Sequence, residues 1–142
     1  MINDPQHTIC VKGWVVKDGK VLFAKRSMNE SHAAGDWVVP GGKVEMELGD
    51  DIAEKTVARE ILEEVGIVIK PNPKIFYTNA FVKKTGEHVV NFSFICEWES
   101  GEAIASEDTD EVKWIKIQDL MKFSDLPKYL NTERDRFLKS CS

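Results

Sequence analysis

The stretch from Val38 to Ile67 constrains the fold of this chain more than any other. Within it Ala53, Val57, Ile61 and Val65 recur every four residues, a spacing that predicts an α-helix with one apolar face. The apolar face requires a core to pack against, and acidic side chains crowd the rest of the same helix. The remainder of the chain is therefore expected to supply that core.

Both ends of this helix carry recognisable signals. Asp51 followed by Glu54 is typical of an N-cap residue and the acid of a capping box. Gly66 is typical of a left-handed C-cap. The sequence therefore predicts a helix bounded by residues 51 and 66.

Three acidic residues of the helix lie at positions that neighbour one another on its surface. Glu60, Glu63 and Glu64 are spaced i, i+3 and i+4, which predicts that their carboxylates converge on one point. On a helical projection Glu64 falls inside the edge of the apolar stripe, where an unpaired carboxylate is costly to desolvate. A positive partner is expected there: Arg59, a lysine, or a divalent metal ion, which prefers oxygen ligands.

At these residues the chain resembles the signature of the Nudix hydrolases, G-x5-E-x7-R-E-U-x-E-E-x-G-U, in which U is aliphatic. The run REILEEVGI, from Arg59 to Ile67, matches the second half of the signature at every fixed position. The run WVVPGG, from Trp37 to Gly42, resembles the usual entry to it.

The first acid of the signature is displaced in this chain. Eight residues separate Gly42 from Asp51, where the family has five before its glutamate. Asp51 keeps the seven-residue spacing to Arg59, so we align Asp51 with that glutamate and place three extra residues in the loop Lys43–Asp50. Glu47 is a rival for the same role.

The resemblance implies a role for each matching residue. The acids Glu60, Glu63 and Glu64 are expected to bind Mg²⁺, with Mn²⁺ as an alternative, and the carbonyl of Gly41 to add a ligand. Arg59 is expected to pair with the first acid, Asp51. Glu60 is our candidate general base, although some members use a distant loop carboxylate instead. The loop acids that qualify here are Glu107, Asp108, Asp110 and Glu111, of which Glu107 is the candidate outer ligand.

Substrate contacts are predicted from backbone and strand positions. Gly42 lacks a side chain where backbone must approach a ligand, and Arg26 ends a strand that faces the substrate in the family. The aromatic residues Phe76, Tyr77, Phe81, Phe92 and Phe94 are candidates to stack on a base.

Each of these residues also has an explanation that involves no chemistry. The helix acids and Arg26 would then be solvated charges, and the loop acids would serve solubility. Asp51 would be only an N-cap, the two glycines only a tight turn, and the strand aromatics plain core.

The rest of the chain alternates in a way that predicts strands and two terminal helices. An Asp-Gly turn at 17–20 predicts a hairpin, and one face of the strand His88–Trp98 is expected to be wetter, at Asn91, Ser93 and Ile95. The expected strands are Thr8–Lys17, Val21–Arg26, Lys74–Lys83, His88–Trp98 and Glu111–Ile117. A short apolar piece is expected at Trp37–Val39, and the segment Ile67–Lys70 follows the helix up to the break at Pro71. The expected terminal helices are Gln118–Phe123 and Pro127–Leu138, the latter with Leu130 and Phe137 inward and the charged run Glu133–Arg136 outward.

This order of elements indicates an α/β fold with a mixed sheet. By resemblance it is a Nudix-type α/β/α sandwich with a central catalytic helix, in a single domain spanning residues 1–142. The net charge of −5 argues against non-specific binding to nucleic acid or to an anionic membrane. The three cysteines lack a C-x-x-C spacing, and no segment resembles a signal peptide or reaches membrane-spanning length, so we expect a cytoplasmic protein.

The resemblance implies Mg²⁺-dependent hydrolysis of a phosphoanhydride in a nucleoside di- or triphosphate derivative. The first expectation is conversion of a nucleoside triphosphate to the monophosphate and pyrophosphate. The alternatives are a nucleotide-sugar pyrophosphatase of the ADP-ribose type and a non-catalytic domain that senses nucleotides. The expected partner is a small nucleotide substrate, with a homodimer as a further possibility.

Overall fold

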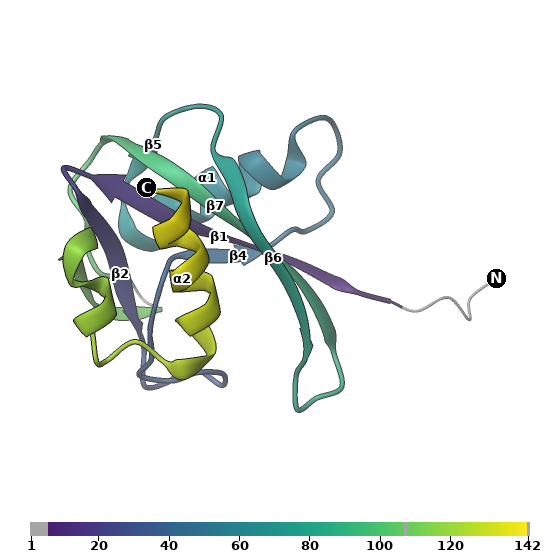
Figure 1. The fold of residues 1–142 in the computed structure, drawn as a ribbon. Helices are drawn as coiled ribbons and strands as arrows, with labels where there is room; N and C mark the ends of the chain where they lie inside the picture. Colours follow the sequence, from purple (N-terminus) through teal and green to yellow (C-terminus); the bar gives the residue numbers. More distant parts are fainter. Residues whose placement is uncertain (1–5, 107, 142) are drawn as a thin grey trace.

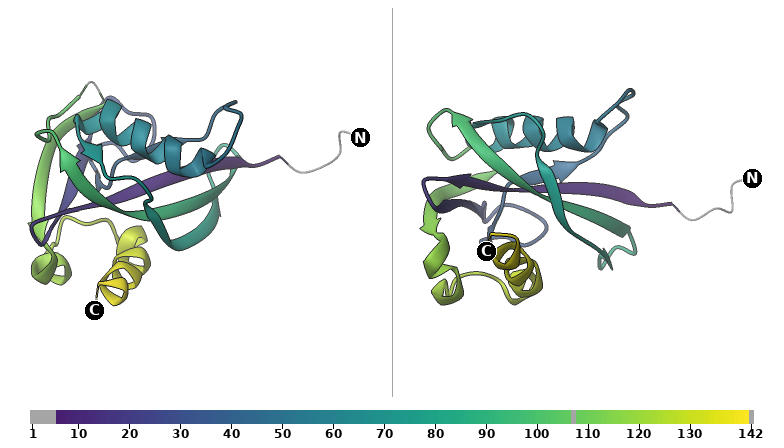
Figure 2. Two further views of the ribbon diagram at one scale, coloured as in Figure 1. Left: turned by 90° about the horizontal axis from the view of Figure 1, so that it is seen from above. Right: turned by 45° about the horizontal axis from the view of Figure 1, so that its top comes forward.

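The computed structural model of the protein describes residues 6–106 and 108–141. Its described residues form a mixed sheet of eight strands (Figure 1). Helix α1 (Ile52–Val65) covers one face of this sheet and helix α2 (Asn131–Ser140) lies against the other (Figure 2). The expected α/β/α arrangement with a mixed sheet is confirmed.

Strand β1 (Thr8–Lys17) lies at the centre of the sheet, where it pairs with β7 (His88–Ser100) in parallel and with β2 (Lys20–Arg26) and β4 (Gly41–Lys43) antiparallel. The other pairings are antiparallel: β2 with β3 (Trp37–Val38) and β8 (Thr109–Lys116), and β7 with β5 (Val68–Ile69) and β6 (Lys74–Val82).

The hairpin predicted at the Asp-Gly turn is present. Lys17 faces Lys20 across it, and Asp18 and Gly19 both have positive φ, 51° and 74°. Two consecutive residues of positive φ are the mark of a type I′ turn, whose twist matches that of the flanking strands.

Three segments differ from the sequence prediction. The glycines of the P-G-G run were predicted as a turn, but Gly41–Lys43 forms strand β4 because its backbone pairs with Lys12, Val11 and Cys10 of β1. The last predicted helix starts later, since Lys128–Leu130 is a 3-10 turn and α2 begins at Asn131; Ile117–Lys122 is also a 3-10 helix.

The sheet separates two apolar layers because side chains alternate along β1. Val11 and Val15 pack with the stripe of α1 on one side, while Trp14 stacks on Phe137 of α2 on the other, with ring centroids 4.8 Å apart. Cys96 is buried in the apolar layer beneath α1. None of the helices within the described part of the chain is long and apolar enough to cross a membrane.

Two side-chain predictions on the α2 side of the sheet are wrong. Glu133 was predicted to point outward, but it is only 2% exposed. One of its oxygens accepts bonds from Trp14 Nε1 at 2.6 Å and from the Ser93 hydroxyl at 2.9 Å, because α2 rests on the polar face of β7. Asn91 and Ser93, expected on a wetter face, are fully buried.

Candidate active site

A pocket of about 290 Å³ opens between α1, the glycines of β4, the end of β2 and the loop before β8. Of the residues predicted to act, it brings together Arg26, Gly41, Glu60, Glu63 and Glu64. Three residues complete its lining: Glu30, Ser106 and Asp108. The pocket is therefore lined by four carboxylates from α1 and the β8 loop, by Glu30, and by one arginine.

The two glycines let the backbone of β4 approach both β1 and α1. A Cβ on Gly41 would collide with the carbonyl oxygen of Val11 and lie 2.9 Å from the Cα of Lys12. A Cβ on Gly42 would occupy the position of the Glu60 carboxyl group. Gly42 therefore makes room for an acid of the site, which is a stronger requirement than a tight turn.

Glu64 is the most buried acid of the group. Its carboxylate accepts a hydrogen bond of 3.2 Å from the backbone N–H of Gly41. Burial raises the pKa of Glu64 to about 7, because one backbone donor and the charge of Arg26 do not offset its desolvation. Glu64 is thus buried as its place at the edge of the apolar stripe predicted, but among the described residues neither Arg59 nor a lysine forms an ion pair with it.

Glu60 and Glu63 are held by Arg59. The guanidinium of Arg59 lies 3.2 Å from a Glu60 oxygen and 3.6 Å from a Glu63 oxygen. Burial raises the pKa of Glu60 and the neighbouring Glu63 raises it further, whereas Arg59 lowers it. The side chain of Glu63 is 60% exposed, so it lies at the mouth of the pocket.

The predicted pairing of Arg59 with Asp51 is wrong. Arg59 instead binds Glu47, with 2.9 Å between its guanidinium nitrogen and a Glu47 oxygen. The loop from Val44 to Asp50 folds back toward the helix and brings Glu47 beside it, so the longer spacing in sequence does not separate the two charges. Glu47 rather than Asp51 therefore makes the pairing with Arg59 that the resemblance implied for the first signature acid.

Asp51 does occupy the N-cap position of α1, with its carbonyl accepting a 2.9 Å bond from the N–H of Lys55. Its side chain makes no capping hydrogen bond, and its backbone is left-handed, with φ of 55°. The predicted capping box is therefore absent. Gly66 is the predicted left-handed C-cap, with φ of 74° and its N–H bonded to the carbonyl of Leu62.

This difference gives a direct test of which acid serves Arg59. Changing Glu47 to Gln is expected to lower kcat/KM by roughly tenfold to a hundredfold, the usual effect of losing a charged group that orients a site residue. Changing the exposed Asp51 to Asn removes the same charge and should leave kcat/KM near that of the wild type. A steady-state assay in which Asp51→Asn lowers kcat/KM and Glu47→Gln does not would support the alignment of Asp51 with the first signature acid.

The three helix acids were predicted to converge on one point, and in this structure they do not. Within the described residues no group of three His, Cys, Asp or Glu side chains is placed to hold a metal ion. Glu60 and Glu63 are drawn to Arg59, while Glu64 turns to the N–H of Gly41. Each acid therefore contacts a hydrogen-bond donor rather than a point shared by all three, as expected because like charges on one helix face repel.

The residue types around the pocket nevertheless fit a hard divalent cation. Carboxylate oxygens are the ligands that Mg²⁺ prefers, and Glu64 is a buried carboxylate with too little positive charge beside it. Glu60, Glu63 and Glu64 are the residues that would hold the cation. Gly41, whose carbonyl was predicted as a further ligand, lines the same pocket.

The loop before β8 contributes to the site through residues that were less favoured from sequence. Asp108 and Ser106 line the pocket, and the carbonyl of Asp108 accepts a 3.0 Å bond from the N–H of Ser27, which fixes the loop beside β2. Glu111 instead pairs with Lys25 at 3.9 Å. Glu107, the predicted outer ligand, lies outside the described residues. Glu30 was not predicted from the sequence to belong to the site. It lies in the pocket lining and forms an ion pair of 3.4 Å with Arg26.

The raised pKa of Glu64 predicts how stability varies with pH in the absence of metal. The folded protein keeps this proton over a pH range in which the unfolded chain has released it, between its ordinary pKa of 4.5 and about 7. Ionisation of Glu64 therefore lowers the free energy of unfolding as the pH rises through that window, by on the order of 3 kcal/mol. Urea denaturation in EDTA should show this loss in the wild type and not in the Glu64→Gln variant. If the free energy of unfolding changed with pH equally in the two proteins, this role of Glu64 would be contradicted.

Comparison with known proteins supports the family resemblance over nearly the whole chain. A family model described as the NUDIX domain matches residues 7–141. A solved structure titled MutT protein from Methanosarcina mazei Go1 superposes with a TM-score of 0.81 at 27% identity, covering 100% of this chain and 99% of that one.

Two curated relatives show sequence similarity over most of this chain. A MutT-like protein from Streptomyces ambofaciens is 32% identical over 114 residues, which is 80% of this chain. An ADP-ribose pyrophosphatase from Methanocaldococcus jannaschii is 30% identical over 116 residues, which is 82% of this chain. The match spans 66% of the length of each relative, just under two thirds.

Proposed function

The chain belongs to the Nudix hydrolase family, and from that premise we propose that it is a Mg²⁺-dependent pyrophosphatase acting on nucleoside triphosphates. The products would be a nucleoside monophosphate and pyrophosphate. One observation carries this proposal: Glu60, Glu63, Glu64 and Asp108 line a single pocket together with Arg26. Acids and an arginine in that arrangement suit a cation and the phosphate it neutralises.

A bound Mg²⁺ would neutralise phosphoryl oxygens and lower the pKa of a water molecule. Arg26 lines the same pocket and would bind a phosphate oxygen through its guanidinium. Its ion pair with Glu30 and its bond to the carbonyl of His32, 2.9 Å long, fix its direction.

Glu60 is our candidate general base. Its carboxylate has a raised pKa and lies in the pocket lining, and a base is most effective when its pKa approaches the working pH. The Glu47–Arg59 pair supports Glu60 and Glu63 from outside. Asp108 is the alternative base, since it is the loop acid that the structure brings into the pocket.

A second candidate function is hydrolysis of a nucleotide sugar. The relative from Methanocaldococcus jannaschii is named an ADP-ribose pyrophosphatase, and its similarity to this chain equals that of the MutT-like relative within a few per cent. The chemistry at the carboxylates would be the same for both substrates, so the difference lies in what is bound beside the phosphates.

Mn²⁺ as the metal, a homodimer and a cytoplasmic location stay predictions.

Product analysis separates these functions. The protein would be incubated with Mg²⁺ and each of the common nucleoside triphosphates, oxidised nucleotides and ADP-ribose, beside a variant with Glu63→Gln and Glu64→Gln. We expect pyrophosphate from triphosphates, and loss of turnover in the variant. Ribose phosphate from ADP-ribose, with little pyrophosphate from triphosphates, would favour the second function. Metal binding without turnover on any compound would favour a sensor.

A further inference from the structure

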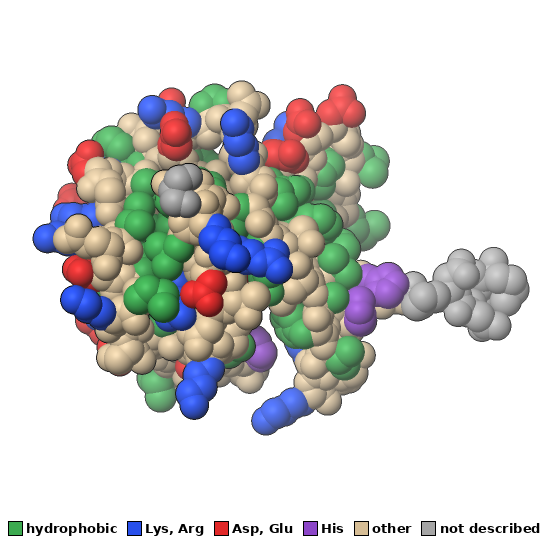
Figure 3. All heavy atoms as spheres, in the orientation of Figure 1, with side chains coloured by type: hydrophobic (Ala, Val, Ile, Leu, Met, Phe, Trp, Pro, Cys, Tyr) green, Lys and Arg blue, Asp and Glu red, His purple; other side chains and the backbone are tan. Residues whose placement is uncertain are grey.

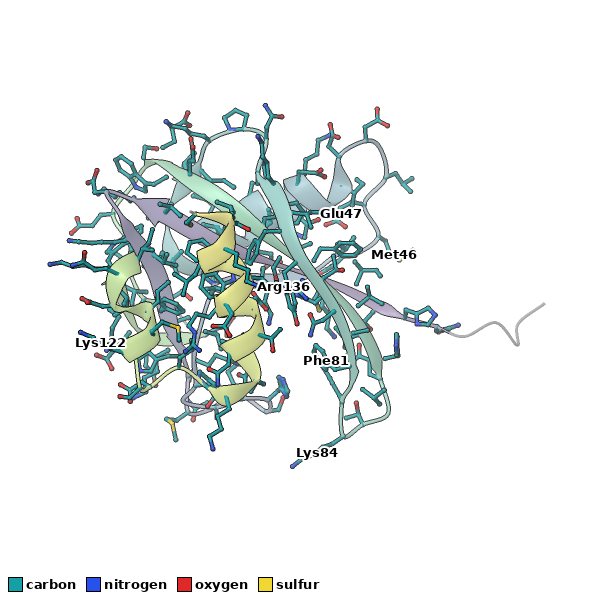
Figure 4. The ribbon with its side chains drawn as sticks, in the orientation of Figure 1. Met46, Glu47, Phe81, Lys84, Lys122 and Arg136 are labelled. Carbon is teal, nitrogen blue, oxygen red and sulfur yellow. The ribbon has the colours of Figure 1, made fainter. Side chains whose placement is uncertain are left out.

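Arg26 is the single basic residue among the described residues that line the acidic pocket, and it is paired with an acid of the same lining, Glu30. Arg59 is not part of this lining, and its guanidinium is held by three acids, one of which is Glu47 on the loop before α1 (Figure 4). Distant charges add little attraction for an anion, since the net charge is −5 and basic and acidic side chains are interspersed on the face shown in Figure 3. Among the protein's own charges in the pocket, phosphate binding therefore depends on Arg26.

Two groups of the loop after β2 bind the guanidinium of Arg26 with different strength. Its Nε–H donates to the carbonyl of His32 at 2.9 Å, an ordinary hydrogen-bond length. Its Nη2 lies 3.4 Å from a Glu30 oxygen, and the two side chains are 28% and 25% exposed. Strong ion pairs of this kind are about 2.7–2.9 Å long, and partly exposed pairs contribute little. Glu30 is therefore a partner that a stronger anion can displace.

A phosphate that binds Arg26 meets Glu30. A guanidinium binds a phosphate best through two of its nitrogens at once. Because the Nε–H already donates to His32, the two nitrogens left for the phosphate are Nη1 and Nη2, and Nη2 is the one beside Glu30. The phosphate either displaces the Glu30 carboxylate or binds next to a group of the same sign. In both cases Glu30 reduces the attraction of Arg26 for the phosphate.

The structure of this loop does not depend on the Glu30 side chain. The backbone closes the loop, since the N–H of Gly35 donates to the carbonyl of Arg26 at 3.0 Å and the N–H of Arg26 donates to the carbonyl of Asp36 at 2.9 Å. The hydroxyl of Tyr129 donates to the Asp36 carboxylate at 2.9 Å and fixes the loop from outside. The contribution of the Glu30 carboxylate is therefore made at Arg26.

We propose that Glu30 competes with the phosphates of the reaction products for Arg26 and thereby speeds product release. Glu30 is a positioning residue, because it acts through Arg26. An arginine with no competing acid would bind each phosphorylated product more tightly, and slow product release limits turnover in many enzymes. This inference rests on the proposed pyrophosphatase function and assigns within it the residue that lowers product affinity.

The test measures product affinity, which does not require turnover. The dissociation constants of GMP and of pyrophosphate would be measured by calorimetry with Mg²⁺ for the wild type, Glu30→Gln, Arg26→Gln and the double variant. The matched control is Glu97→Gln, which removes an acid from another exposed ion pair, 3.6 Å from Lys70 and outside the pocket lining. Thermal denaturation checks that each variant is folded.

We expect Glu30→Gln to bind at least one product more tightly, by roughly threefold to tenfold, because the competing charge is gone. The control should match the wild type, and the gain should vanish when Arg26 is already Gln. If Glu30 only held Arg26 in place, its loss would weaken binding instead. Unchanged or weaker affinity for both products would overturn the inference, as would an equal gain in the Arg26→Gln background.

Steady-state kinetics with GTP give a second readout. Glu30→Gln should lower KM and strengthen product inhibition, with kcat/KM at least as high as in the wild type, whereas a raised KM would overturn the inference. The two proposals can fail separately. Tighter product binding in Glu30→Gln without any hydrolysis by the wild type would refute the proposed activity alone, whereas hydrolysis with unaltered product affinity would refute the role of Glu30 alone.

Discussion

Replacing Glu64 with Gln is expected to lower kcat by roughly a thousandfold while leaving the metal-free protein more stable near pH 7 than the wild type. The activity falls because the most buried acid of the pocket no longer supplies a charged ligand. The stability rises because the neutral amide removes a carboxylate whose pKa burial raises to about 7. Single-turnover assays and urea denaturation on the same preparations would measure the two effects.

The matched control for Glu64→Gln is Glu54→Gln, which removes a carboxylate from the first turn of the same helix, outside the pocket lining. It should leave kcat within a few-fold of the wild type. A Glu64→Gln protein that retains full activity, or that loses stability near pH 7, would contradict the role assigned to this acid.

The second large effect is expected at the two glycines of β4, which should respond differently to alanine. In Gly41→Ala the new Cβ meets backbone atoms of Val11 and Lys12, so β1 and β4 must separate, at a cost of about 3 kcal/mol in the free energy of unfolding. In Gly42→Ala it meets only the end of the Glu60 side chain, which can move. The fold should then survive while kcat falls, because Glu60 is displaced from the pocket.

Thermal denaturation and a steady-state assay on both alanine variants check this contrast. Val39→Ala, a change at a buried residue just before Pro40 that does not line the pocket, serves as the control for a general loss of packing. Equal destabilisation by the two glycine changes, or full activity in Gly42→Ala, would contradict the claim that the glycines are required for the close approach of β4 to β1 and to Glu60.

Much of the fold was predictable because its signals are local. The apolar stripe of α1, the C-cap at Gly66 and the Asp-Gly hairpin each depend on residues close in sequence, and each is found as predicted. Strand β4 was missed because three residues carry too little periodicity, and its pairing is decided by β1, far away in the chain.

The candidate site was predictable only where the residues share one helix. Glu60, Glu63 and Glu64 line one pocket because helix geometry fixes their spacing, although their carboxylates do not meet at one point. The partner of Arg59 could not be predicted in this way, because loops of several different lengths can return an acid to the helix. Counting residues favoured Asp51, whereas the structure pairs Arg59 with Glu47. Glu133 was misplaced for a related reason: its burial follows from how α2 docks on β7, and no pattern within α2 reveals that contact.

The dependence of nucleotide hydrolysis on Mg²⁺ tests the central proposal most directly. Pyrophosphate release from GTP would be followed across a Mg²⁺ titration from an EDTA-treated, metal-free start, with the wild type and Glu64→Gln side by side. The account predicts no release without metal, a saturable rise with Mg²⁺ in the wild type, and little rise in the variant. Hydrolysis that proceeds in EDTA, or that responds to Mg²⁺ equally in the two proteins, would contradict it.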